Sequence, residues 1–208
     1  MTNPLAGKHI LITGGGTGIG LACATLLRAH GAVVTLMGRR LDRLEAARDA
    51  LMATPGAQVR VAAGDVADEA AVEAAVAVAT REGGALDGCI AAAGTGTFGP
   101  LLDTPLDQWQ NVLNTNLTGA MLTIKHAGRA MVRAGGGSIV ALSSIAGVLT
   151  HRWMTAYCVS KAGVEMLARN AADELGGAGV RVNAIRPGLV PTDLAAGLVN
   201  NPAANADY

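Results

Sequence analysis

The segment TGGGTGIG, residues 13–20, joins a short apolar run at His9–Thr13 to a stretch with helical apolar spacing at Ile19–Ala29. This order predicts a strand, a glycine-rich turn and the start of a helix. Such a turn presents unpaired N–H groups at the positive end of the helix dipole, and its glycines have no Cβ atom to hold a phosphate away. A plain tight turn beside a closely packed helix would use the same glycines. The residues predicted to hold a dinucleotide pyrophosphate are Thr13, Gly14, Gly16, Thr17, Gly18, Ile19 and Gly20.

Strands and helices are predicted to alternate along the rest of the chain. The runs predicted as strands are His9–Thr13, Val33–Met37, Val59–Ala62, Gly88–Ala92, Ser138–Leu142 and Val180–Ile185. The predicted helical stretches are Ile19–Ala29, Leu41–Met52, Glu69–Arg81, Leu106–Arg133 (as two helices) and Ala156–Leu175. Uniformly apolar strands suit a parallel sheet with helices on both faces. We expect one domain over residues 1–208, a doubly wound, Rossmann-like α/β sheet that binds a dinucleotide.

The amino-acid composition indicates which kinds of binding partner the chain is suited to. The chain has 208 residues, of which 50% are hydrophobic, and its 16 Lys and Arg balance its 16 Asp and Glu. This balance argues against nucleic-acid and membrane surfaces and favours a small-molecule partner. The 3 cysteines and 4 histidines show no metal-like spacing, so we expect no disulfide framework and no metal. The first residues lack a secretory pattern and no apolar run is long enough to span a bilayer, which predicts a cytoplasmic protein.

Two arginines stand where a dinucleotide site contacts the adenosine ribose. An NAD site places an acid there, about 20 residues beyond the glycine turn. Here Arg39 and Arg40 follow the second predicted strand, and an arginine pairs with a 2′-phosphate through charge-assisted hydrogen bonds. We therefore predict NADP rather than NAD, although two solvated arginines would also suit the start of a helix. Asp65 and Val66 end the third strand, where an acid could meet the adenine amino group.

Tyr157 and Lys161 lie four residues apart in a predicted helix and therefore project from one face. A phenol normally titrates near pH 10, and the Lys161 ammonium together with the positive charge of an oxidised nicotinamide would favour the phenolate. A pKa lower by roughly 3 units corresponds to about 4 kcal/mol. We expect Tyr157 to exchange protons near neutral pH, although this spacing alone also occurs on ordinary helix surfaces.

The glycine turn is followed by further motifs in a fixed order. Ser143 and Ser144 end the fifth strand, Tyr157-Cys-Val-Ser-Lys161 begins a helix, and Pro187-Gly188 follows the sixth strand. Together they resemble the short-chain dehydrogenase/reductase family over nearly the whole chain, in particular its NADP-preferring carbonyl and 3-oxoacyl reductase-like members. The resemblance implies an oxidoreductase that transfers a hydride between NADP(H) and a carbonyl compound or secondary alcohol.

The resemblance also implies a role for each residue of a tetrad. Tyr157 matches the general acid/base, and Ser144 matches the serine that holds the substrate oxygen, with Ser143 as a bystander. Lys161 matches the lysine that binds the nicotinamide ribose and lowers the tyrosine pKa, and Asn116 matches the asparagine that positions a relay water. The further cofactor contacts that it implies are Ala92, Ala93, Gly94, Tyr157, Lys161, Pro187, Gly188, Val190 and Thr192.

The chain departs from the family pattern in two places. Ala91-Ala92-Ala93-Gly94 replaces the usual Asn-Asn-Ala-Gly, which removes amides that brace the sheet, and we expect an effect on stability rather than on activity. Family members are typically longer, so the resemblance implies that the C-terminal helix and last strand are lacking. Residues 193–208 are then the start of the substrate-loop region, with a polar, poorly ordered tail at Asn200–Tyr208.

The substrate and the oligomeric state are less directly predicted. Members of the family commonly form homodimers or homotetramers through the two helices predicted here at Leu117–Arg133 and Ala156–Leu175, both apolar on more than one face. Burial within one chain would produce the same pattern. The candidates for the substrate pocket, with Arg152 as a possible anion contact, are Thr95–Phe98, Ala146, Leu149, His151–Met154 and Leu189, and core or rim packing explains each equally well.

Two other readings compete with the enzyme. The chain could be a nucleotide-binding regulator that retains the fold, or a truncated and inactive form of a longer enzyme. A binding module has no need of a proton relay, so the complete set of Asn116, Ser144, Tyr157 and Lys161 favours the enzyme.

Overall fold

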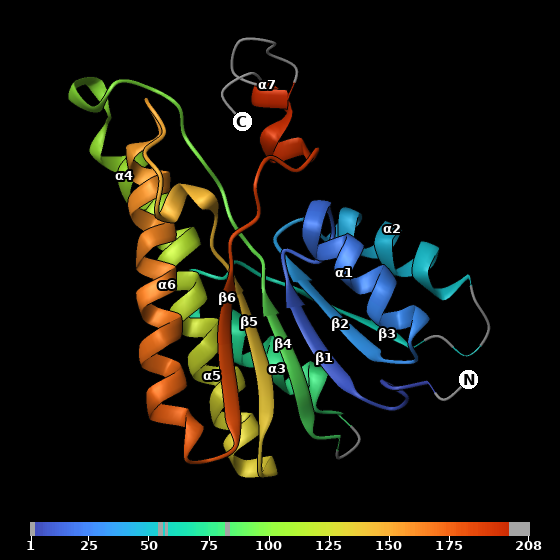
Figure 1. The fold of residues 1–208 in the computed structure, drawn as a ribbon. Helices are drawn as coiled ribbons and strands as arrows, with labels where there is room; N and C mark the ends of the chain where they lie inside the picture. Colours follow the sequence, from blue (N-terminus) through green and yellow to red (C-terminus); the bar gives the residue numbers. More distant parts are fainter. Residues whose placement is uncertain (1–2, 54–55, 57, 82–83, 200–208) are drawn as a thin grey trace.

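Six parallel strands form the centre of the computed structural model, which describes residues 3–53, 56, 58–81 and 84–199 (Figure 1). The sheet has the order β3-β2-β1-β4-β5-β6, so the chain reverses direction across the sheet between β1 and β4. The strands are β1 His9–Thr13, β2 Val33–Gly38, β3 Val59–Ala63, β4 Leu86–Ala91, β5 Gly137–Leu142 and β6 Val180–Ile185. The predicted doubly wound, Rossmann-like sheet is confirmed. Ligands of such sheets bind at the carboxyl ends of the strands, at this switch point.

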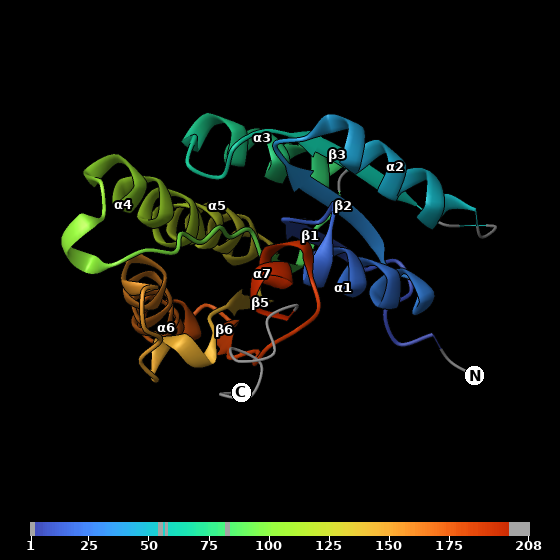
Figure 2. The same cartoon turned by 90° about the horizontal axis from the view of Figure 1, so that it is seen from above.

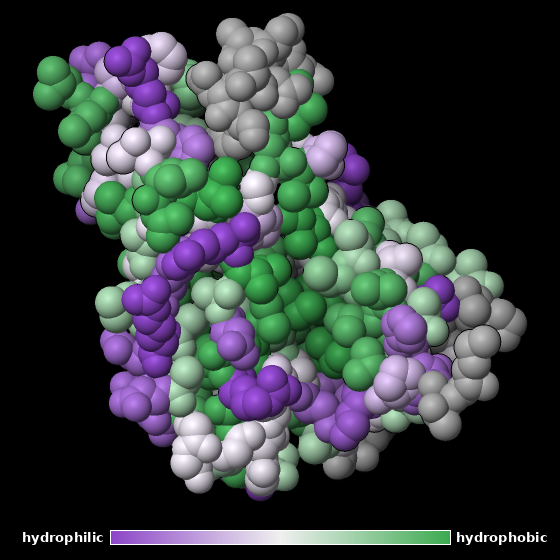
Figure 3. Space-filling model, in the orientation of Figure 1, coloured by the Kyte–Doolittle hydropathy of each residue, from purple (hydrophilic) through white to green (hydrophobic). Residues whose placement is uncertain are grey.

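Helices lie on both sides of the sheet (Figure 2), although in the described part of the chain they leave one face of β4, β5 and β6 without a helix (Figure 1). Figure 3, in the same orientation as Figure 1, shows apolar surface in the middle of this side of the molecule. One core cluster joins α1 (Gly18–Ala29) and α2 (Leu41–Met52) to β1 and β2, with Ile12, Leu36 and Leu44 as fully buried members. A second, larger cluster joins the opposite face of the sheet to α3 (Glu69–Ala79), α5 (Gly119–Ala134) and α6 (Thr155–Gly176). Apolar side chains at helical spacing thus bury one face of each helix, which is what the sequence pattern predicts.

The segment predicted as two helices over Leu106–Arg133 contains a third element. α4 (Leu106–Leu113) and α5 are both present, but a π-helical turn at Asn114–Thr118 joins them. The apolar periodicity of the sequence does not distinguish this turn from an α-helix, because a single π-helical turn widens the helix only locally. The other predicted elements are all present, with shifts of up to two residues at their ends; β4, for example, begins at Leu86 instead of Gly88.

The last described segment lies above the carboxyl ends of the strands (Figure 1). It forms a 3₁₀ turn at Asp193–Ala195 and the short α7 (Ala196–Val199). The tail predicted to be poorly ordered, Asn200–Tyr208, lies outside the described residues. β6 forms one edge of the sheet, and among the described residues no further strand pairs with it. Nor does any helix within this part of the chain have the length and apolarity needed to cross a membrane.

Candidate active site

The glycine turn lies against the end of β4, at the switch point of the sheet. Gly14 has φ +67°, and a Cβ atom added there would lie 2.9 Å from the backbone nitrogen of Ala93. A Cβ atom on Gly20 would lie only 2.3 Å from the carbonyl oxygen of Gly14. The chain therefore excludes side chains from both positions, and the backbone at the start of α1 stays open to an anion. This arrangement fits the pyrophosphate of a dinucleotide.

Thr13 connects the end of β1 to the segment where the family pattern has amide side chains. Its Oγ1 accepts hydrogen bonds from the backbone nitrogens of Ala92, at 3.2 Å, and Ala93, at 3.3 Å. The threonine thus supplies a brace at the switch point despite the missing amides. Gly94 follows directly, and a Cβ atom on it would lie 3.5 Å from Asn116 Oδ1 and 3.6 Å from Lys161 Nζ. Gly94 thus brings the backbone after β4 close to Asn116 and Lys161.

The residues predicted to contact the adenosine end lie at the ends of β2 and β3. Arg39 Nη1 is 3.7 Å from Asp65 Oδ2, and both side chains are exposed. The sequence predicts a separate ligand group for each of these two residues, whereas the structure pairs them with each other. Arg40 is exposed at the N-cap of α2. Val66 is buried against Gly119, where a Cβ atom would lie 2.5 Å from Val66 Cγ2, so the Val66 side chain belongs to the packing of α5.

Asn116 lies in the π-helical turn, and its side chain fastens the loop after β4. Its Oδ1 accepts a hydrogen bond from Thr95 N at 2.7 Å, and its Nδ2 donates to Thr95 O and Ser160 Oγ, both at 2.9 Å. Both amide hydrogens are therefore committed. The relay water predicted for Asn116 would therefore have to donate a hydrogen bond to an oxygen atom of Asn116. Ser160 in turn donates to Tyr157 O at 2.7 Å, which links the turn to α6.

Ser144, Tyr157 and Lys161 converge at the carboxyl end of β5. Ser144 follows the strand, and its Oγ accepts a hydrogen bond from Ala146 N at 3.1 Å. Burial raises the pKa of Tyr157, and a hydrogen bond with Ser144 opposes this rise. Lys161 Nζ lies 5.6 Å from the centroid of the Tyr157 ring. The structure thus brings together the three residues that the resemblance assigned to the reacting centre.

In the chain without cofactor the pKa of Tyr157 is raised, whereas the lowering predicted from the sequence also relies on the positive charge of a bound nicotinamide. Desolvation of the phenol is the larger effect, and the Lys161 ammonium does not offset it. Lys161 is itself 4% exposed, donates to Leu142 O at 2.7 Å, and has its pKa lowered by burial to about 8. The neutral phenol is the form that the protein residues alone favour.

Ser143 points away from the reacting centre. Its Oγ donates to Lys161 O at 2.9 Å and to Glu165 Oε1 at 3.0 Å. Glu165 also accepts a hydrogen bond from Arg186 Nε at 2.6 Å, and this contact holds the pKa of the Glu165 carboxyl below its usual value. The Glu165 contacts escaped the sequence analysis, because only the fold brings Arg186, just after β6, beside α6.

The loop after β6 crosses from the reacting centre to the glycine turn. Pro187 O accepts a hydrogen bond from Ile145 N at 3.1 Å, which places Pro187 beside the end of β5. Farther along, Thr192 lies over the turn, because a Cβ atom on Gly18 would be 3.2 Å from Thr192 Cγ2. Leu194 then approaches Gly96. The predicted loop residues Gly188 and Val190 lie between these contacts.

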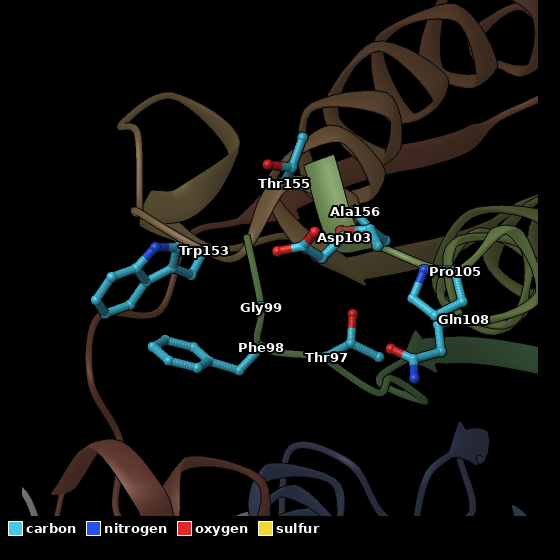
Figure 4. A pocket seen from close by; sticks show the side chains of 10 residues that line it. Thr97, Phe98, Gly99, Asp103, Pro105, Gln108, Trp153, Thr155 and Ala156 are labelled. Atoms are coloured by element: carbon cyan, nitrogen blue, oxygen red, sulfur yellow. The ribbon is translucent and has the colours of Figure 1, made fainter. Parts of the chain in front are cut away.

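A cavity of about 240 Å³ opens beside the loop that follows β4 (Figure 4). Of the residues predicted for the substrate pocket, Thr97, Phe98 and Trp153 line it. The other residues predicted for the pocket do not line this cavity: Thr95, Gly96, Ala146, Leu149, His151, Arg152, Met154 and Leu189. Sequence reasoning missed the remaining lining residues, which have no periodic pattern: Gly99, Asp103, Thr104, Pro105, Gln108, Thr155 and Ala156. No group of three or more His, Cys, Asp and Glu in the described part of the chain is placed to hold a metal ion.

The fold and the site define a dinucleotide-binding oxidoreductase, and comparisons with known proteins identify its family. The protein family described as "short chain dehydrogenase" matches residues 8–203 of this chain. The chain is 39% identical over 191 residues to 2-(S)-hydroxypropyl-CoM dehydrogenase 3 of Xanthobacter autotrophicus, covering 91% of this chain and 74% of that protein. It is 37% identical over 191 residues to L-rhamnose 1-dehydrogenase (NAD(P)(+)) of Sphingomonas sp., covering 91% of this chain and 75% of that protein.

Solved structures agree with this result. A short-chain type dehydrogenase/reductase from Mycobacterium ulcerans superimposes with a TM-score of 0.94 at 42% identity, covering 98% of this chain and 75% of that one. The chain belongs to the short-chain dehydrogenase/reductase family. It is an oxidoreductase of alcohol and carbonyl substrates that uses a nicotinamide cofactor.

Proposed function

We propose that the chain interconverts a ketone and a secondary alcohol with NADP(H), with Tyr157 as the general acid/base. The observation that supports this proposal best is the convergence of Ser144, Tyr157 and Lys161 beside Gly94. Because the glycine turn and these residues lie at the same switch point, one dinucleotide can reach from the turn to Tyr157.

The chemistry divides between the cofactor and the chain. When bound, the nicotinamide supplies hydride transfer at the carbonyl carbon. Ser144 holds the substrate oxygen through its hydroxyl, and Tyr157 gives a proton to that oxygen in reduction and takes it back in oxidation. Lys161 would exchange its hydrogen bond to Leu142 O for the ribose hydroxyls of the cofactor. Asn116 holds the loop at Thr95 beside this site.

The preference for NADP over NAD rests on Arg39 and Arg40. Both guanidinium groups are exposed at the end of β2, where the adenosine ribose of a dinucleotide lies in such sheets. Each could donate to a 2′-phosphate. Asp65 would keep its predicted contact with the adenine, although its ion pair with Arg39 draws both groups together.

The proposal includes a homo-oligomeric assembly and a cytoplasmic location. Exposed apolar side chains on α5 and α6, among them Met121, Val159 and Met166, suit a homodimer or homotetramer formed through these helices. The three cysteines are free thiols, as a cytoplasmic protein would have. We keep residues 1–208 as one cofactor-binding and catalytic unit, since both halves of the single sheet contribute to the site.

The Tyr157→Phe variant tests the proposed reaction. Purified wild-type chain should oxidise NADPH in the presence of a panel of ketones, whereas the variant should lose turnover and retain its dissociation constant for NADPH. The phenylalanine keeps the ring but removes the proton donor. Full activity in the variant would contradict the role of Tyr157. A Met166→Lys variant tests the assembly, because a charge within the helix interface should shift the molar mass in solution towards the monomer.

A further inference from the structure

The few aromatic residues of this chain are not spread evenly over it. The sequence has 1 phenylalanine, 2 tryptophans and 2 tyrosines. Three of these five, Phe98, Trp153 and Tyr157, lie around the proposed reacting centre. Gly96, two residues before Phe98, lies against the tyrosine, because a Cβ atom on Gly96 would lie 3.6 Å from Tyr157 Cδ2 and 4.0 Å from Leu194 Cδ1. The aromatic surface is therefore concentrated next to the proton donor.

Phe98 and Trp153 form a defined pair. Their ring centroids are 5.3 Å apart with an interplanar angle of 78°, an edge-to-face arrangement. Gly99 N donates to Trp153 O at 2.9 Å, so the loop after β4 and the loop before α6 are joined at this point. Figure 4 shows the two rings together at one end of the cavity, opposite Pro105 and Gln108. Each ring is thus fixed relative to the start of α6 and Tyr157.

The backbone of Trp153 departs from ordinary geometry to hold this position. Its φ of +67° is the only positive value for a non-glycine residue in the described ranges. A bulky side chain rarely adopts this conformation unless the surroundings impose it, and such residues cluster at ligand sites. The hydrogen bond from Gly99 and the contact with Phe98 provide that support. The tryptophan ring is therefore held at the site rather than released into solvent.

Both rings remain accessible in the free chain. Phe98 is 62% exposed and Trp153 is 47% exposed, and Leu149, four residues before Trp153, and Leu194, which approaches Gly96, are 57% and 55% exposed. Clustered exposed apolar side chains mark binding surfaces. Arg152, whose guanidinium carbon is 5.9 Å from the centroid of the Trp153 ring, adds a positive charge, and Asp103 in the lining of the same cavity adds a negative one, so the surface favours neither a cationic nor an anionic ligand. The surface best suits an uncharged apolar group.

We infer that the Phe98–Trp153 pair selects substrates with a bulky, apolar ring at the reacting carbon, such as alicyclic ketones and alcohols. This inference rests on the proposed function, since it places the ring of the substrate between the aromatic pair and Tyr157. Short hydroxylated substrates would leave the two rings without an apolar partner.

The test compares ring and open-chain ligands by binding and by turnover. The binding probes are cyclohexanol and glycerol, added to the chain saturated with NADP⁺, and the readout is the NMR signal of the Trp153 indole N–H, assigned with Trp153→Phe. The turnover probes are cyclohexanone and dihydroxyacetone with NADPH. We expect cyclohexanol, but not glycerol, to shift the Trp153 signal.

Phe98→Ala is the decisive variant, and Leu102→Ala, at a 95% exposed position, is its control. Loss of one apolar contact should lower the ratio of kcat/KM for cyclohexanone over dihydroxyacetone by about tenfold and weaken cyclohexanol binding similarly, with the dissociation constant of NADPH unchanged. Leu102→Ala should leave both ratios as in the wild type.

The outcomes separate the two proposals. If cyclohexanol fails to shift the Trp153 signal, or if Phe98→Ala changes neither ratio, the aromatic pair does not select the substrate. If turnover occurs without preference for the ring, the inference alone is wrong. If cyclohexanol binds at Trp153 but neither ketone is reduced, the aromatic site stands and the proposed reaction fails.

Discussion

The ammonium nitrogen of Lys161 lies 2.7 Å from the carbonyl oxygen of Leu142, the last residue of β5. Burial of this side chain lowers its pKa from 10.5 to about 8. Between these two pH values the unfolded chain therefore binds more protons at this lysine than the folded chain does. Folding stability then rises with pH across this range, because the cost of burying the charged form disappears as the amine is neutralised.

Lys161→Met tests this linkage. The free energy of unfolding of the wild type, relative to the variant, should rise between pH 8 and pH 10.5, by up to about 3 kcal/mol. Chemical denaturation at a series of pH values measures the difference and cancels other titrating groups. Lys125→Met, at a surface lysine with a side chain 41% exposed, is the control and should show no such rise. Parallel curves for wild type and Lys161→Met would contradict the buried charge.

Arg39 should discriminate between the two nicotinamide cofactors. Arg39→Ala removes a donor to the 2′-phosphate, so affinity for NADPH should fall about tenfold or more, with little change for NADH. Asp65→Asn is the matched variant, because it removes the partner of Arg39 and keeps the arginine; NADPH affinity should stay equal or increase. Titration calorimetry of the wild type and both variants with NADPH and with NADH measures the dissociation constants. An equal loss for NADPH and NADH in Arg39→Ala would disprove the 2′-phosphate contact.

The sequence was sufficient to predict the sheet. Apolar runs and glycine positions are local signals, and β1, α2 and β6 have the bounds that these signals predict. The order of motifs also predicted which residues meet at the end of β5. Short-range patterns determine secondary structure, and parallel strands then place their carboxyl ends on one edge.

The contacts that modify the chemistry were not predictable in this way. The hydrogen bond of Lys161 with Leu142 O and the ion pair of Arg39 with Asp65 join residues whose side-chain directions only the fold sets. Desolvation of Tyr157 depends on packing from several elements, and it raises the pKa of Tyr157 in the chain without cofactor. The π-helical turn at Asn114–Thr118 is likewise a product of tertiary packing, since its sequence is compatible with a continuous helix.

Alanine substitutions at two positions of the glycine turn, Gly16 and Gly20, should differ in their effect on stability. A Cβ atom on Gly20 would lie 2.3 Å from Gly14 O, a backbone atom, so Gly20→Ala must displace the turn. A Cβ atom on Gly16 would lie 3.3 Å from Leu44 Cδ2, at the end of a flexible side chain. We expect Gly20→Ala to lower the free energy of unfolding by about 1–3 kcal/mol and to abolish NADPH binding, with a smaller stability effect for Gly16→Ala. Equal destabilisation in denaturant titrations would contradict the geometry.

The ionised Glu165 should make folding stability depend on pH in the acidic range. Arg186 and Ser143 donate hydrogen bonds to its carboxylate and hold the pKa of Glu165 below its ordinary value of 4.5. Because the folded chain then binds fewer protons than the unfolded chain, this contribution is fully present above pH 4.5 and is lost as the pH falls through the lowered pKa.

Glu165→Gln should therefore lower the free energy of unfolding by about 1–3 kcal/mol at pH 7, and by less near pH 3, because the contribution of the charge is progressively lost as the pH falls below 4.5. The same change at Glu174, exposed on the same helix, is the control and should have little effect at either pH. Urea denaturation at the two pH values measures both. A deficit in Glu165→Gln that stays constant with pH would show that the glutamate contributes through packing rather than through its charge.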